Sequence, residues 1–268
     1  MVPLDVLDAV RDADIAPVKR WLDDGGSPDD NLQDPSAFSL MCAALLGAPD
    51  HPNEILEIVR LLATRGASLN SNVTVPDLEW SPTYVSLAIN AVAVNHDAIV
   101  VLELLLELGA DPNIHGIMPR RSFPMLVNAL MHSQIAVVRL LIKHGASLET
   151  AFDGGSFTPD AVLSIEEYDR KIRETSRHPS HQIDESFSFI YAVRAAGGTW
   201  RGYLAAPRRD LNTLRVLCAR GRATPPPGGV LALLFPQDAT GNSASAPLVL
   251  PPETWWLVVS FWKSGRDD

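Results

Sequence analysis

Apolar side chains recur three and four positions apart in four segments of similar design. This period places the apolar residues on one face of a helix. The four segments are Val18–Asp29, Val59–Asn70, Leu102–Asn113 and Val138–Glu149. Each contains a glycine four residues before its end, and glycine readily adopts the left-handed conformation that terminates many helices. With a weaker fifth copy at Phe189–Thr199, the pattern predicts helices that stop at Gly25, Gly66, Gly109, Gly145 and Gly197.

A shorter helix is predicted before each of these longer ones, and every short segment contains alanine. Small side chains let two helices approach closely, and Pro124 suits the start of a helix because its missing N–H is not needed there. The short segments are Leu7–Arg11, Phe38–Leu45, Thr83–Ala91, Phe123–Met131 and Thr158–Leu163. Pairs of helices that stack in this way should bury Leu61, Leu62, Leu104, Leu105, Leu140 and Leu141.

The glycines are unevenly spaced, from 36 residues (Gly109 to Gly145) to 52 residues (Gly145 to Gly197). We expect the extra residues in loops. The longest insertion, at 165–186, should form one extra helix followed by a loop. Shorter ones should lengthen the turns at 47–53 and 90–97 and the connection at 70–82.

The five-residue tails that begin at these glycines resemble the ankyrin repeat family, whose unit of about 33 residues ends in G-A-D-x-N. The tail Gly109–Asn113 matches that ending literally, Gly66–Asn70 and Gly145–Glu149 match it closely, and Phe38–Ala44 is a degraded T-P-L-H-x-A-A. The resemblance implies an all-α, ankyrin-type helical solenoid of about five degenerate repeats over residues 1–200. It also implies a non-catalytic scaffold that binds a protein partner through its groove and fingers.

Finger residues are the candidate partner-binding groups. Trp80, Arg120, Arg121 and Phe152 all fall in predicted fingers. Exposed tryptophan and arginine are favoured anchors of protein interfaces. We therefore expect these four side chains to lie on one edge and to contact the partner.

Residues 201–268 do not continue the repeated pattern of residues 1–200, and their sequence predicts a C-terminal helical extension. Asp210–Gly221 has the pattern of an amphipathic helix, and 236–247 is a small, polar stretch expected to be a flexible linker. In Leu250–Trp262, the residues Trp255, Val258, Val259 and Trp262 form one apolar stripe at helical spacing. A cap would bury this stripe on the repeats or on the Asp210–Gly221 helix.

Two short motifs offer an alternative function. Leu250, Pro251, Glu253, Val258, Ser260 and Trp262 resemble the first helix of an F-box, and Thr213–Cys218 resembles the elongin-binding box of SOCS-box proteins. The resemblance implies a substrate-recognition adaptor of a ubiquitin ligase that recruits a Skp1-like or elongin-like subunit. Leu250, Pro251, Glu253, Val258 and Trp262 are then the candidate adaptor-binding residues. The chain ends at residue 268, before the later helices of a full F-box.

Charge and composition exclude several classes of function and partner. The formal net charge of −10 argues against a general nucleic-acid binder. No apolar run approaches the roughly 20 residues that span a bilayer. Two cysteines cannot form a disulfide framework, and the N-terminus has no secretory pattern, so we expect an intracellular protein, cytoplasmic or nuclear. No motif for a nucleophile, metal or phosphate is present, so we expect no enzyme, no cofactor, no metal, no small-molecule substrate, no nucleic acid and no membrane.

One stretch runs against the acidic average. Residues 200–224 carry six arginines and a single acidic residue, Asp210. This basic stretch could contact an acidic protein, RNA or the acidic repeats themselves, and the last is the favoured interpretation.

Overall fold

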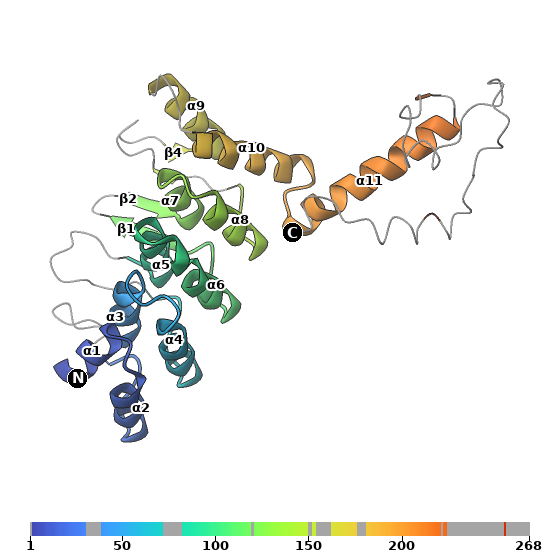
Figure 1. The fold of residues 1–268 in the computed structure, drawn as a ribbon. Coiled ribbons are helices and arrows are strands. Elements are labelled where there is room, and N and C mark those ends of the chain that lie inside the picture. Colours follow the sequence, from blue (N-terminus) through green and yellow to red (C-terminus); the bar gives the residue numbers. More distant parts are fainter. Residues whose placement is uncertain are drawn as a thin grey trace. The chain divides into compact units, whose positions relative to one another are not determined.

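The structure is a computed structural model, drawn as a ribbon in Figure 1. The described residues are 2–30, 39–71, 82–118, 121–149, 152–153, 162–175, 181–220, 222–223 and 255. They are mostly helical, as the sequence predicts. No helix among them is long and apolar enough to cross a membrane. The chain divides into two compact units, unit 1 at Met1–Ile190 and unit 2 at Tyr191–Asp268.

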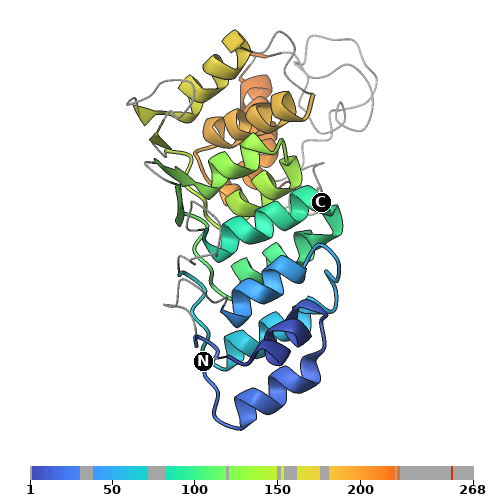
Figure 2. The same cartoon turned by 90° about the vertical axis from the view of Figure 1, so that its left-hand side faces the viewer.

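Unit 1 contains four helix pairs of similar build. They are α1 (Leu4–Arg11) with α2 (Ile15–Asp23), α3 (Leu40–Gly47) with α4 (Ile55–Thr64), α5 (Tyr84–Val94) with α6 (Ile99–Glu107), and α7 (Met125–Met131) with α8 (Ile135–Lys143). The first helices of the pairs pack on one another in chain order, and so do the second helices (Figure 2). A single turn of 3-10 helix, His96–Ala98, precedes α6. Each pair is therefore one layer of a stack. The first helices of the pairs form one column, and the second helices form another.

Small residues sit where the first helices meet. Ala44, Ala88 and Ala129 occupy matching positions on α3, α5 and α7, and each is fully buried. Of the six leucines expected in the core, Leu61 is half-buried rather than buried, so that prediction is wrong for this residue. The buried face of α4 is centred on Ile55, Ile58, Val59 and Leu62. One residue before Leu62, a side chain points about 100° away from that centre.

Short strands connect successive pairs. β1 (His115–Met118) and β2 (Arg121–Pro124) form an antiparallel hairpin between α6 and α7. β3 (Phe152–Asp153) pairs with β4 (Val162–Leu163) after α8. β2 also contacts β3, so neighbouring connections lie side by side.

The fifth helix pair differs from the predicted one. Its first helix is α9 (Ile165–Thr175), the segment expected to be an insertion, and its second is α10 (His181–Ala195), which begins inside the stretch expected to be a loop. Val162–Leu163, predicted to be helical, is the strand β4. A capping box fixes the start of α9: Glu167 N–H donates to Ser164 Oγ at 3.2 Å, and Ser164 N–H donates to Glu167 Oε2 at 2.8 Å. The hydrogen bond from Ser164 N–H to the carboxylate, together with a side-chain hydrogen bond from Ser164, lowers the pKa of the Glu167 carboxyl.

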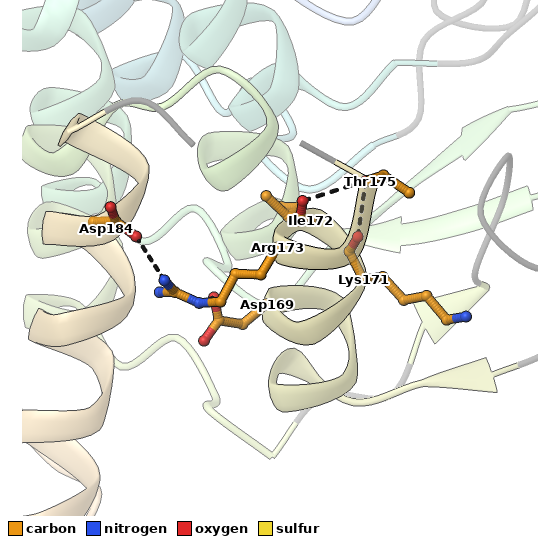
Figure 3. Close-up of polar contacts among 6 residues, drawn as sticks. All are labelled: Asp169, Lys171, Ile172, Arg173, Thr175 and Asp184. Atoms are coloured by element: carbon orange, nitrogen blue, oxygen red, sulfur yellow. Dashed lines mark hydrogen bonds and ion pairs between the residues drawn. The ribbon is translucent and has the colours of Figure 1, made fainter. Parts of the chain in front are cut away.

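Side chains hold α9 against α10. The rings of Tyr168 and Phe187 lie 6.3 Å apart. Arg173 donates from Nε to Asp169 at 2.7 Å and reaches Asp184 on α10 with Nη1 at 3.0 Å (Figure 3). One charged residue of α9, Arg173, thus forms an ion pair with the partner helix α10.

Unit 2 contains α11 (Trp200–Ala219), which starts ten residues before the predicted Asp210. Thr199 caps it by accepting a hydrogen bond from Gly202 N–H at 3.0 Å. Arg209 Nη2 donates to the carbonyls of Ala196 at 2.9 Å and Gly202 at 3.0 Å. These contacts join the first turns of α11 to the segment before it. The helix continues through Pro207, a residue that weakens helix interiors.

The five predicted glycine stops are confirmed. Gly25, Gly66, Gly109, Gly145 and Gly197 have φ angles of 97°, 89°, 100°, 95° and 105°. The next residue then donates its N–H to the carbonyl five positions back, for example Ala110 to Leu105 at 3.0 Å and Ala146 to Leu141 at 2.9 Å. This is the Schellman closure, which satisfies carbonyls that the helix end leaves open.

The same closure forms without glycine after α7, which provides a matched pair of substitutions. Ser133 has φ 55°, and Gln134 N–H donates to Ala129 O at 3.1 Å. A Cβ added at Gly109 meets no atom within 4 Å, so Gly109→Ala should destabilise unit 1 through backbone strain alone, by about 1 kcal/mol. Ser133→Gly relieves strain of that kind but gives the unfolded chain more backbone freedom. These effects offset each other, so the loss of stability should be less than about 0.5 kcal/mol. Urea unfolding measures both; equal losses would contradict the prediction.

Candidate functional site

Hydrogen bonds between successive tails hold the bases of the connecting loops in register. In three consecutive tails the last residue, an Asp or Asn, accepts a hydrogen bond from the third backbone N–H of the next tail. The pairs are Asp29 with Ser68 (3.0 Å), Asn70 with Asp111 (2.7 Å) and Asn113 with Ser147 (2.7 Å). Asn113 Nδ2 also donates to Gly145 O at 3.2 Å. The recurring polar residue of the tail is therefore a link between layers, a role that a single tail does not reveal.

Buried polar groups join the starts of the first helices. Ser39 caps α3 by accepting from Cys42 N–H, and its hydroxyl lies 2.9 Å from Tyr84 Oη at the start of α5. Burial raises the pKa of the Tyr84 phenol, which therefore stays neutral. Thr83 forms a capping box with Ser86 and donates to Met125 Sδ at 3.5 Å. Hydroxyl groups thus join the starts of neighbouring first helices.

The structure places two of the four predicted finger residues on adjacent strands. Arg121 lies in β2 opposite Met118, and Phe152 lies in β3 opposite Leu163. Because β2 contacts β3, these positions are close along one edge of unit 1. Trp80 and Arg120 lie outside the described residues, as do Leu250, Pro251, Glu253, Val258 and Trp262.

Three exposed apolar side chains lie near the ends of neighbouring first helices, and sequence analysis missed them. Leu46 on α3, Val94 on α5 and Met131 on α7 are 38%, 78% and 60% exposed. We call these three residues the apolar ledge. Hydrogen bonds tie the adjoining turns: Asn95 Nδ2 donates to Pro49 O at 2.8 Å and Gln134 Nε2 donates to Ile89 O at 3.3 Å. Helical periodicity did not single out these residues, because it separates helix faces and does not report what covers a helix end.

The titratable groups of the core do not form a reactive cluster in the described residues. Burial raises the pKa of the Cys42 thiol to about 12, so the thiol is protonated at neutral pH. Cys218 is also buried. Within the described ranges, no three His, Cys, Asp or Glu side chains are grouped so that they could hold a metal ion.

The C-terminal segment is represented by Trp255, which is 1% exposed. Trp255 forms a small core with Cys218, and Leu211, Leu214 and Ala223 pack against it. The Arg215 guanidinium lies 4.3 Å from the centre of the indole ring, a cation–π contact. The first residue of the predicted apolar stripe is therefore buried on the Asp210–Gly221 segment, one of the two places that a cap would use; Val258, Val259 and Trp262 lie outside the described residues.

No protein-family model and no curated protein matches the chain. Its function must be inferred from its own residues.

The links between tails can be tested at Asn113. Asn113→Ala removes the acceptor for Ser147 N–H and the donor to Gly145 O, so it should destabilise unit 1 by about 1 kcal/mol. Asn113→Asp keeps the acceptor and should recover part of that loss. Urea unfolding of both variants checks this, and a loss for the aspartate variant as large as for alanine would mean that the Ser147 bond contributes nothing.

Proposed function

We propose that unit 1 is an ankyrin-type solenoid that binds a protein partner without catalysing a reaction. One observation carries the proposal: the same closure recurs in successive layers. In the first three layers, each closure combines a helix pair, a left-handed glycine and a tail residue that bonds to the next tail. Hairpin strands between the layers add the fingers that this family uses for recognition.

The surface that the proposal assigns to the partner has two parts. Arg121 and Phe152 lie on adjacent strands, with Trp80 and Arg120 predicted to extend the same edge. The apolar ledge adds three exposed hydrophobic side chains on the first helices. Aromatic, arginine and exposed apolar groups are the side chains that most often carry the energy of protein association.

The finger edge is tested by replacing Trp80, Arg120 and Arg121 together with alanine. Capture of the main partner from the native cell should weaken by about tenfold or more, since such anchors often contribute over 1 kcal/mol each. A matched triple of Lys19, Arg20 and Arg60 to alanine, exposed on α2 and α4, should leave capture unchanged. Both variants should keep the melting curve of the parent. If the finger variant unfolds, its residues are packing groups; if it captures normally, the partner binds elsewhere.

The second proposal is the ubiquitin-ligase adaptor, and the packing of Trp255 bears on it. Leu214 and Cys218 belong to the elongin-box-like stretch, and both contact Trp255. An elongin-like subunit would reach them only after Trp255 moved away. The F-box-like residues lie outside the described residues, so the packing of Trp255 does not test their part in this proposal.

Deletion of residues 248–268 distinguishes a cap from an adaptor box. As a cap, the segment supplies Trp255, so its removal should uncover Leu211, Leu214 and Cys218 and lower the melting temperature. Captured material should still contain the same proteins. If the truncated chain melts like the parent but loses a ubiquitin-ligase subunit from the captured complex, the adaptor function replaces the cap.

A further inference from the structure

α11 carries a band of arginines along one side. With 3.6 residues per turn, Arg201, Arg208, Arg209, Arg215 and Arg220 fall within a face about 140° wide. The helix contains one acidic residue, Asp210, and it points away from that face by the same geometry. We call the five residues the arginine face.

Three of these residues, Arg201, Arg209 and Arg220, are exposed. Within the described part of unit 2, neither Arg201 nor Arg220 forms a side-chain hydrogen bond or ion pair. Arg209 is exposed and donates only to main-chain carbonyls. Val216 is 39% exposed and lies between Arg209 and Arg220 on the same side of the helix.

We propose that the arginine face is a docking surface for an acidic helical segment of another protein. Carboxylates spaced along such a segment would pair with Arg201, Arg209 and Arg220, and one apolar side chain would cover Val216. Arginine favours this role because its planar guanidinium binds a carboxylate with two parallel hydrogen bonds. The surface is in unit 2, so the inference goes beyond the function proposed for unit 1.

The sequence favoured the acidic repeats of the same chain as the partner of residues 200–224. If those repeats occupy the arginine face, the peptide in the test below will not bind, and the proposal is overturned. Two other anionic partners fit less well. A helix that binds an anionic membrane inserts its apolar face, but on α11 Leu211 and Leu214 on that face are covered by Trp255. A nucleic acid is a long polyanion, and the chain has a net charge of −10, which opposes its approach over distances of a Debye length. A short acidic segment meets the positive face without bringing an extended charge near the rest of the chain.

The test uses the full-length protein and a fluorescent amphipathic peptide of glutamate, leucine and alanine, as long as the 20-residue α11. Fluorescence anisotropy should show saturable binding that weakens with added salt. Arg201→Glu with Arg220→Glu should weaken binding by about tenfold or more, since each reversal replaces an attraction by a repulsion. Lys19→Glu with Arg60→Glu changes the net charge equally on exposed positions of unit 1 and should leave binding unchanged.

Every other outcome overturns the proposal. A peptide with glutamine in place of glutamate should not bind, and equal binding would show that the arginines are not recognised. Equal weakening by the two charge-reversal pairs would indicate only a response to net charge. Tighter binding of a single-stranded RNA oligonucleotide or of anionic phosphatidylserine vesicles than of the peptide would assign the face to that ligand. The side chains of Arg201 and Arg220 have no described polar contact to lose in unit 2. The variant that carries both substitutions should therefore fold, which circular dichroism verifies.

Discussion

The left-handed glycine at the end of each second helix is the constraint on which the layers of unit 1 depend. It lets the chain reverse within one residue, so that the following N–H can close the helix on the carbonyl five positions back. The reversal buries the small residue after Gly66, Gly109 and Gly145 and starts the tail at the same point in each layer. Only because the tails start alike can the Asp or Asn at the end of one tail reach the next.

Links at the surface contribute less to this arrangement than buried ones. Asp23 with Arg65 at 2.6 Å and Glu103 with Lys143 at 3.0 Å bridge neighbouring second helices, but these side chains are substantially exposed. Exposed pairs of this kind stabilise a protein by less than about 1 kcal/mol. The buried alanines and the Ser39–Tyr84 bond hold the first helices without relying on charge. Exposed charges on the second helices can therefore change at little cost to the fold.

The sequence predicted features that depend on local chemistry and missed those that depend on distant contacts. The glycine stops and the helix pairs were predictable because a terminating glycine and a helical apolar period are local signals. A helix beginning at residue 165 was predicted, but only as an insertion. Its place as the first helix of the fifth pair, where Ser164 and Glu167 form its capping box, was missed because the repeat template placed that pair earlier. The early start of α11 was missed as well. Thr199 caps it, and Arg209 reaches back to the Ala196 carbonyl, a contact that the sequence alone does not show. For the site, the sequence placed Arg121 and Phe152 in fingers, but the apolar ledge emerges only when three helices stack.

The two cysteines make the opening of each unit separately observable. Cys42 is buried on α3, in the second helix pair of unit 1, and Cys218 packs against Trp255 in unit 2. A buried thiol reacts with an alkylating reagent only when the structure around it opens. Cys42 is protected in a second way, because burial raises the pKa of its thiol and the protonated thiol is not the reactive form. The rate at which each cysteine is modified under native conditions therefore measures a local unfolding equilibrium, with one natural reporter in each unit.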